Sequence, residues 1–173
     1  MANTSTRLTA SFFERDTVTV ARELLGKALV RVFFDGEQRR YRITETEAYC
    51  GPHDLACHAS KGRTARTEVM FKAGGHVYVY LIYGMYWMLN FVSGPEGEAS
   101  AVLIRGLEGF SGPGRVGREL ALGRSFYGEN VETSSLLWLE DAPPVQNVVA
   151  SPRVGINYAG EPWVSMEWRF MEG

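Results

Sequence analysis

Runs of apolar, β-branched and aromatic residues alternate with short turn signals along most of the chain. Residues 27–34 form one such run, Asp35-Gly36 is a strong hairpin signal, and residues 39–48 form the next run. Further strands are expected at residues 76–83, 86–92, 101–104, 136–139, 145–149 and 163–170. Strands joined by tight turns pair antiparallel, so residues 27–34 are expected to pair with residues 39–48, and residues 76–83 with residues 86–92.

Helical signals are fewer and shorter. Asp16 is suited to cap a helix over residues 17–25, and Gly26 is suited to end it. The Gly-Pro-Gly sequence at residues 112–114 is expected to open a second helix. A third, short helix is expected around His58.

The length and composition bound the kind of protein. A chain of 173 residues fits one domain and can bury a core without disulfides or a metal, so a single domain is expected over residues 1–173. Residues 1–7 lack the apolar core of a signal peptide, and no run of about 18 apolar residues is present to span a bilayer. A cytoplasmic location is therefore the default expectation. Cys50 and Cys57 are too few for a disulfide framework and are consistent with a reducing compartment.

The charges argue in two directions about the partner. The formal net charge of −2 mildly disfavours a polyanion. An electrostatic footprint needs only one basic face, however. Residues 58–72 carry four Lys or Arg against one acid, and residues 113–124 carry three against one. Such stretches are either solvated surface or a face for nucleic acid, and charge alone leaves both readings open.

Two carboxylates occupy one strand of the first hairpin. If this strand is regular, Glu45 and Glu47 share an otherwise apolar face with Tyr41 and Ile43. Carboxylates on such a face are costly unless they are paired, hydrogen-bonded or active in chemistry.

The second hairpin presents aromatic rings and an amide. Alternation places Tyr78 and Tyr80 on one face, while Tyr83 lies beside the turn and points differently. In the return strand Asn90 stands among large apolar residues, where an unsatisfied amide would cost about 1 to 3 kcal/mol. It is therefore either a member of a structural network or a group that selects a ligand.

Several motifs stand together along the chain. They are Glu45-Thr46-Glu47-Ala48-Tyr49, Gly51-Pro52, Asp54, His58, the run from Tyr78 to Met85, Asn90, Val102-Leu103-Ile104-Arg105 and Gly112-Pro113-Gly114. Together they resemble the alkyladenine (3-methyladenine) DNA glycosylase family over nearly the whole chain. The resemblance implies the α+β fold class, as a single mixed domain with a curved antiparallel β-sheet, flanking helices and a protruding β-hairpin. It also implies a monofunctional base-excision enzyme that needs no metal and no cofactor.

The resemblance assigns a role to each matching residue. It makes Glu47 the carboxylate that activates water and Arg105 the residue that contacts both. The residues that bind the base are Tyr49, His58, Tyr80 and Asn90, and among them Asn90 excludes guanine. The residue that intercalates in DNA is Tyr83, and the residues at the DNA backbone are Arg115, Val154 and Gly155.

The expected chemistry is consistent with these roles. A damaged base must rotate out of the duplex before an enzyme can reach it, and a rigid ring such as Tyr83 would fill the gap. Alkylation at a ring nitrogen makes a purine cationic, so aromatic rings attract it by about 0.5 to 2 kcal/mol more than a neutral base. Because a cationic base leaves readily, ionised Glu47 need only activate a water and stabilise charge at C1′.

The expected partner is double-stranded DNA that contains damaged purines. The candidates are 3-methyladenine and 7-methylguanine, with hypoxanthine or ethenoadenine as further candidates. The protein is expected to be a monomer that does not bind membranes and that associates with the nucleoid when it acts on DNA.

Two alternatives stay open. The first is a zinc site in a nucleic-acid-binding module, with Cys50, His53, Cys57 and His58 as the candidate ligands. Against it, adjacent Cys57 and His58 point in different directions on any regular element. The second is a catalytically silent damaged-DNA-binding protein of the same fold. The presence of Glu47 and Arg105 argues against this alternative.

Overall fold

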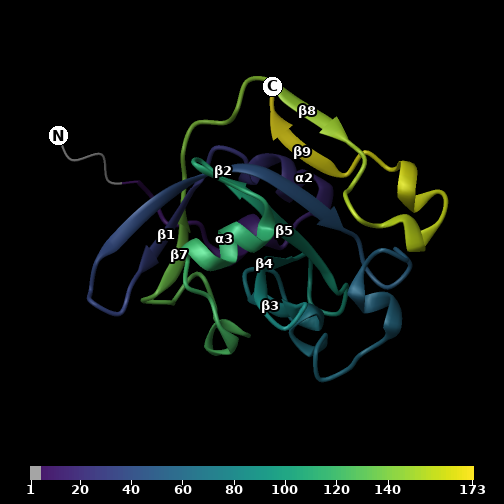
Figure 1. Ribbon diagram of the computed structural model, residues 1–173, viewed down its shortest axis with the longest axis horizontal. Coiled ribbons are helices and arrows are strands. Elements are labelled where there is room, and N and C mark those ends of the chain that lie inside the picture. Colours follow the sequence, from purple (N-terminus) through teal and green to yellow (C-terminus); the bar gives the residue numbers. More distant parts are fainter. Residues whose placement is uncertain (1–4) are drawn as a thin grey trace.

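The computed structural model describes residues 5–173 (Figure 1). Residues 1–4, on which the expectation about a signal peptide partly rests, lie outside the described part. The strands are β1 (Ala28–Val32), β2 (Gln38–Tyr49), β3 (Val77–Ile82), β4 (Tyr86–Ser93), β5 (Ser100–Leu107), β6 (Phe110–Ser111), β7 (Leu137–Glu140), β8 (Val148–Ser151) and β9 (Arg169–Glu172). The α-helices are α1 (Ala10–Phe13), α2 (Thr17–Leu24) and α3 (Pro113–Glu119). Short 3-10 helices lie at His58–Lys61, Glu68–Phe71, Arg124–Phe126, Asn157–Ala159 and Trp163–Ser165.

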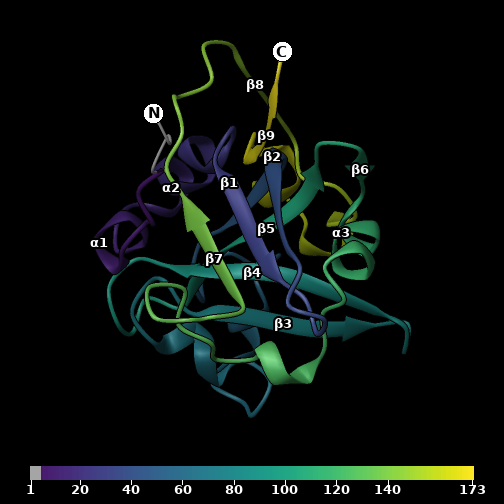
Figure 2. The same cartoon turned by 90° about the vertical axis from the view of Figure 1, so that its left-hand side faces the viewer.

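The described strands form one curved antiparallel sheet that does not close on itself. Its main path has the order β3-β4-β5-β2-β1-β7, while β6 pairs with β5, and β9 pairs with both β2 and β8. Figure 2 shows the β3–β4 hairpin extending beyond the body of the molecule. The expected fold class, α+β with a curved antiparallel sheet and a protruding hairpin, is confirmed.

The helices cover the sheet at two places. Helix α2 packs on β2 and β5, and helix α3 packs on β4 and β5. As predicted, the Asp16 carboxylate caps α2 by accepting a hydrogen bond from the Thr19 N–H at 2.9 Å. In α3 a Cβ at Gly117 would lie 1.9 Å from the Trp87 carbonyl oxygen, so only glycine lets this helix approach β4. None of the helices in residues 5–173 is long and apolar enough to cross a membrane.

Strand β2 is irregular, and this corrects one expectation. Its pairing with β5 shifts between Ile43 and Thr46. Tyr41 and Ile43 belong to the main hydrophobic core, whereas Glu45 and Glu47 both contact an arginine at the cavity described below. The expectation that all four side chains share one face is therefore wrong. The irregularity turns the two carboxylates away from the core that holds Tyr41 and Ile43.

Other elements follow the sequence to different degrees. Both predicted hairpins are confirmed, since β1 pairs with β2 and β3 with β4. The prediction of a strand over residues 163–170 is wrong for most of its length, because a 3-10 helix occupies Trp163–Ser165 and β9 begins only at Arg169. Short apolar segments of this kind do not distinguish strand from helix by their pattern alone.

Candidate active site

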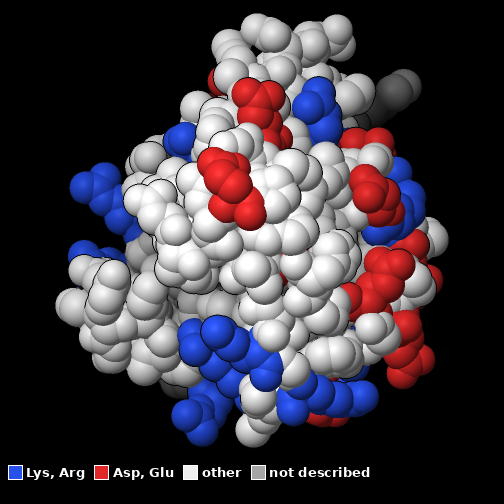
Figure 3. All heavy atoms as spheres, turned by 90° about the vertical axis from the view of Figure 1, so that its right-hand side faces the viewer, with Lys and Arg blue, Asp and Glu red and all other residues white. Residues whose placement is uncertain are grey.

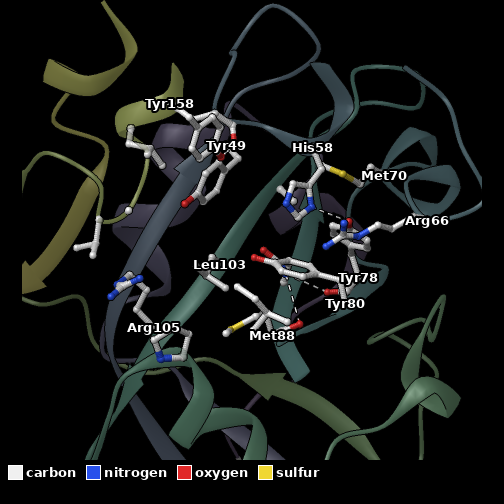
Figure 4. Close-up of a pocket in the computed structure, with 18 of the residues that line it drawn as sticks. Tyr49, His58, Arg66, Met70, Tyr78, Tyr80, Met88, Leu103, Arg105 and Tyr158 are labelled. Carbon is white, nitrogen blue, oxygen red and sulfur yellow. Dashed lines mark hydrogen bonds between the residues drawn. The ribbon is translucent and has the colours of Figure 1, made fainter. Parts of the chain in front are cut away.

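A cavity of about 370 Å³ opens on the face of the sheet formed by β2, β5, β4 and β3. The residues of the sequence-based assignment that line it are Tyr49, His58, Tyr80, Tyr83, Asn90, Arg105, Val154 and Gly155. Figure 4 shows Tyr49, His58 and Tyr80 pointing into the cavity from different elements. The volume lies within the range of roughly 300 to 1,000 Å³ that small-molecule sites occupy. The fold thus brings residues from distant parts of the chain around a space that suits a flat ring.

Glu47 lies directly behind the wall of this cavity. Its side chain is fully buried, and the residues that contact it, Tyr49, Arg105 and Val154, all line the cavity. The Val154 backbone N–H donates to Glu47 Oε2 at 2.7 Å, and the Tyr49 hydroxyl donates to Oε1 at 2.9 Å. The Arg105 guanidinium lies 3.5 Å from Oε1. These contacts hold the carboxylate in one orientation beside the cavity.

Two opposing effects act on the acidity of Glu47. Burial raises its pKa, because an ionised carboxylate loses its hydration there. The charge of Arg105, the Val154 N–H, the Tyr49 hydroxyl and the charge of Arg153 favour the ionised form and limit the rise of this pKa. A carboxylate with a raised pKa that is still ionised accepts a proton better than an ordinary one. The surroundings of Glu47 therefore suit a general base.

Arg105 joins both carboxylates of β2. Its Nε lies 3.1 Å from Glu45 Oε1, while its Nη1 is the atom that lies 3.5 Å from Glu47. Arg169 of β9 donates to the same Glu45 oxygen at 2.6 Å. Glu45 thus holds two arginines in place, while Glu47 is the carboxylate that contacts the cavity wall.

His58 and two tyrosines form an aromatic part of the wall. The ring centroids of His58 and Tyr80 are 4.5 Å apart, with their planes at 69°. His58 Nδ1 lies 2.9 Å from the Tyr78 hydroxyl. Burial, and after it the charge of Arg66, lowers the pKa of His58 to about 4, so this imidazole is neutral at neutral pH. A neutral ring can stack on a cationic ligand without repelling it.

Asn90 is buried on β4 and lines the cavity. Its side-chain NH₂ lies 3.2 Å from the Tyr78 carbonyl oxygen and 3.5 Å from that of Met88, and donates to both. These bonds satisfy the buried amide and also fix its orientation. The two readings of Asn90, network member and selecting group, are therefore compatible.

Tyr83 stands at the tip of the β3–β4 hairpin. Tyr83 and Gly84 have φ values of 53° and 65°, as the central residues of a tight hairpin turn require. The Tyr83 side chain is 84% exposed, and those of Leu81 and Met85 are exposed as well. A protruding ring with this exposure is available to contact a partner. Its role as the intercalating residue stays a prediction.

The residues expected at the DNA backbone lie in two places. Val154 and Gly155 line the cavity, and the Val154 N–H donates to the Glu47 carboxylate. Arg115 is exposed in the first turn of α3, two residues after Pro113, and only Pro113 of this pair is among the described residues that line the cavity. The structure therefore brings Val154 and Gly155 to the site and leaves Arg115 on the surface beyond it. Their contacts with DNA stay predictions.

Other residues at the site escaped the sequence-based assignment. Arg66 lines the cavity and lies over the Tyr80 ring, 5.0 Å from its centroid. Tyr158 also lines it and donates to the Ala56 carbonyl oxygen at 3.2 Å. Arg66 had a weak signal, since it belongs to a locally basic stretch. Tyr158 had none, because it lies in a short 3-10 helix within an irregular segment.

The side chains considered as zinc ligands do not converge. Cys57 Sγ contacts the Ala99 carbonyl oxygen at 3.7 Å, and the His53 ring packs near Trp163. Burial raises the pKa of Cys50 and of Cys57 to about 12, which disfavours the thiolates that bind zinc. Within residues 5–173 no group of three or more His, Cys, Asp or Glu is arranged to hold a metal ion. The zinc alternative therefore lacks a site in the part of the chain that the structure describes.

The surface carries a basic patch despite the negative net charge of the chain. Figure 3 shows the side of the molecule that bears the loop over residues 50–72 and the C-terminal segment. Lys and Arg gather along its lower part, whereas Asp and Glu lie mainly above and to the right. This separation of charge gives one part of the surface the sign that attracts a polyanion.

Comparison with known proteins identifies the class of enzyme that this fold and site define. A relative from Methanocella arvoryzae is 45% identical over 185 residues, which cover 95% of this chain and 92% of the relative. One from Anaeromyxobacter dehalogenans strain 2CP-C is 49% identical over 179 residues, covering 95% and 82%. One from Legionella pneumophila strain Lens is 44% identical over 173 residues, covering 95% and 93%. All three are provisionally named 3-methyladenine DNA glycosylases, and the class is therefore that of the DNA glycosylases.

A family model agrees with these relatives. The model described as methylpurine-DNA glycosylase matches residues 11–111 and 108–173. The chain belongs to the methylpurine-DNA glycosylase family. The resemblance seen in the sequence is thereby confirmed, and DNA follows as the substrate of the enzyme.

Proposed function

We propose that this DNA glycosylase excises alkylated or deaminated purines from double-stranded DNA. The candidate substrates are 3-methyladenine, 7-methylguanine, hypoxanthine and ethenoadenine. The observation that carries the proposal is the placement of Glu47, a buried carboxylate with a raised pKa held by two hydrogen bonds behind an aromatic cavity. The names of the relatives, which refer to 3-methyladenine, support the first candidate.

In this proposal the hairpin and the cavity handle the base. Tyr83 enters the duplex as the damaged nucleotide rotates out. The base then stacks against Tyr49, His58 and Tyr80, whose uncharged rings attract a cationic purine through cation–π interaction. The fixed amide of Asn90 opposes the 2-amino group of guanine, so that normal guanine is disfavoured.

Glu47 carries out the chemical step. It accepts a proton from a water molecule whose oxygen attacks C1′, and the N-glycosidic bond breaks with its electron pair leaving on the base. An alkylated cationic purine thereby departs as a neutral base, and an abasic site remains in the DNA. The negative charge of Glu47 also stabilises the positive charge that develops on the sugar, while Arg105 helps to keep the carboxylate ionised.

Neutral lesions make a further demand on the site. Hypoxanthine leaves more readily when it is protonated. The pKa of His58 is lowered to about 4, so at neutral pH this ring does not carry the extra proton that a general acid would donate. Burial raises the pKa of Tyr80 to about 12, and Tyr49 is also shifted well above its ordinary pKa. We therefore expect hypoxanthine to be excised more slowly than 3-methyladenine.

The test uses duplexes that each carry one lesion, namely a stable 3-methyladenine analogue, 7-methylguanine, hypoxanthine or ethenoadenine. After incubation with the protein, the DNA is treated with alkali and strand breaks are measured. Breaks that appear only after alkali are expected, because a monofunctional glycosylase leaves an intact strand with an abasic site. A shifted band without breaks for every lesion would favour the catalytically silent damaged-DNA-binding protein instead.

A further inference from the structure

Arg153 is a buried cation for which the proposed mechanism has no direct task. Its two terminal nitrogens bind the two carboxylate oxygens of Asp54 at 2.7 and 3.1 Å, and both side chains are 0% exposed. The Arg153 guanidinium also donates to the Ala48 carbonyl oxygen at 3.0 Å. Buried ion pairs often contribute no net stability compared with well-packed hydrophobic residues. The contacts of this pair with its neighbours therefore indicate a role other than stability.

The pair contacts the surroundings of Glu47 from several sides. Ala48 lies between Glu47 and Tyr49 in β2, so the Arg153 guanidinium donates a hydrogen bond to the strand one residue after Glu47. The Tyr49 ring centroid lies 4.9 Å from Arg153 Cζ, and the Tyr49 hydroxyl donates to Glu47. The residue after Arg153 is Val154, whose N–H is the second donor to Glu47.

Asp54 also accepts hydrogen bonds from two backbone N–H groups. Its Oδ2 accepts from the Cys50 N–H at 2.9 Å, and its Oδ1 accepts from the Ala56 N–H at 3.1 Å. On the other side, the Trp168 ring centroid lies 4.9 Å from Arg153 Cζ. The pair thus connects the end of β2, the turn over residues 50–56 and the segment that leads to Val154.

We propose that Arg153 and Asp54 are a positioning pair, which holds the Tyr49 hydroxyl and the Val154 N–H against Glu47 so that the carboxylate keeps one orientation toward the attacking water. The inference rests on the proposed function, in which Glu47 activates that water. Both residues act through the donors to Glu47 and not by touching the base. The charge of Arg153 adds to the effect, since it is one of the influences that limit the pKa of Glu47.

The test removes both charges together, in the variant Arg153→Gln/Asp54→Asn, so that no single charge is left buried without its partner. The matched control is Lys27→Gln/Asp141→Asn. It removes another ion pair, with Lys27 Nζ 2.7 Å from Asp141 Oδ1, whose residues are not among those lining the cavity. Single-turnover excision of 3-methyladenine analogue is measured across pH for both variants and the wild type, together with affinity for a duplex carrying an abasic-site analogue.

We expect the Arg153→Gln/Asp54→Asn variant to bind this duplex within about threefold of the wild type and to excise the base at least about tenfold more slowly. The acidic limb of its pH–rate profile is expected at higher pH than in the wild type. The control is expected to keep the rate and the limb of the wild type. An unchanged rate and limb in the first variant would overturn the inference, as would an equal loss in the control.

A second variant is used if the double variant fails to fold, which would show as the absence of a cooperative thermal unfolding transition. Arg153→Lys keeps the charge but cannot form the bidentate contact with the Asp54 carboxylate. Slower excision with binding of the abasic duplex retained supports the positioning role, and an unchanged rate overturns it. Inactivity of the wild-type protein on every lesion would overturn the proposed function instead, so the two failures can be told apart.

Discussion

Glu47 shows how one side chain can be buried and still be suited to accept a proton. Burial alone would favour its protonated form, which cannot act as a base. Arg105 and the donors Tyr49 and Val154 counter this effect by stabilising the ionised form. Each of these groups lies on a different segment of the chain, so the basicity of Glu47 depends on the folded arrangement.

The substitution Glu47→Gln tests the carboxylate directly. It keeps the side-chain size and removes the charge, so excision is expected to fall by about 10² to 10⁴-fold while lesion-containing duplex is still bound. Single-turnover excision and a gel-shift titration measure the two properties. The control is Glu140→Gln, because Glu140 of β7 is also a buried, ion-paired glutamate but pairs with Arg40 at the start of β2. Full activity of Glu47→Gln would remove this residue from the mechanism.

The pH dependence follows from the raised pKa of Glu47. The base is active only when ionised, so kcat/KM is expected to fall on the acidic side as pH drops through this pKa, which lies above the ordinary value of 4.5. Arg105→Met removes the charge that most limits this rise, and the acidic limb is then expected to move to still higher pH. Arg105→Lys, which keeps a positive charge, should shift it less. A limb that stays in place in Arg105→Met would contradict the assignment.

At the scale of elements, the β3–β4 hairpin places two tyrosines in different surroundings. Regular pairing of β3 with β4 directs Tyr80 into the cavity, and the tight turn leaves Tyr83 exposed at the tip. Both residues therefore belong to one hairpin, with one at the cavity wall and the other at the tip. This geometry suits an enzyme that must open a duplex and receive the displaced base in one movement.

The substitution Tyr83→Ser tests the function of the hairpin tip. Excision from double-stranded DNA is expected to fall by at least about tenfold more than excision from single-stranded DNA, because only the duplex needs a group to fill the gap. Parallel kinetics on the two substrates measure this difference. The matched control is Phe34→Ser, which removes the exposed aromatic residue at the turn between β1 and β2. Equal effects of Tyr83→Ser on both substrates would speak against intercalation.

At the scale of the whole molecule, the distribution of charge matters more than its sum. The net charge is −2, yet Lys and Arg gather on one part of the surface in Figure 3. Phosphate contacts act over short distances at physiological salt, since charges further apart than about 8 Å are largely screened. A local basic patch can therefore hold DNA although the whole protein is slightly acidic.

The substitution Arg115→Ala tests whether this exposed arginine of α3 contacts the DNA backbone. Affinity is expected to fall similarly for damaged and undamaged duplexes, and the salt dependence of binding should decrease by about one phosphate contact. Binding titrations at several salt concentrations measure both effects. Arg39→Ala serves as the control, because Arg39 is an exposed arginine paired with Glu37 on the first hairpin. An unchanged salt slope for Arg115→Ala would place this residue outside the DNA contact.

Local features of the molecule could be predicted from the sequence because neighbouring residues cause them. The cap at Asp16, the hairpins and the position of Tyr83 beside a turn depend on turn residues and on alternation within a few positions. The family resemblance extended this to the cavity, since eight of the residues to which it assigned a role line it. Regular alternation failed at Glu45 and Glu47, because a shift in strand pairing depends on the neighbouring strand as well as on β2 itself.

The sequence by itself therefore determined the hairpins, the fold class and the family, and it supplied a first set of candidate site residues. Only the tertiary structure decided how Glu47 is held, that His58 is neutral, and that Arg153 and Asp54 form a buried pair beside Tyr49. The reason is physical. Burial and charge act through space between segments far apart in the chain, and a pattern of neighbouring residues carries no information about those distances.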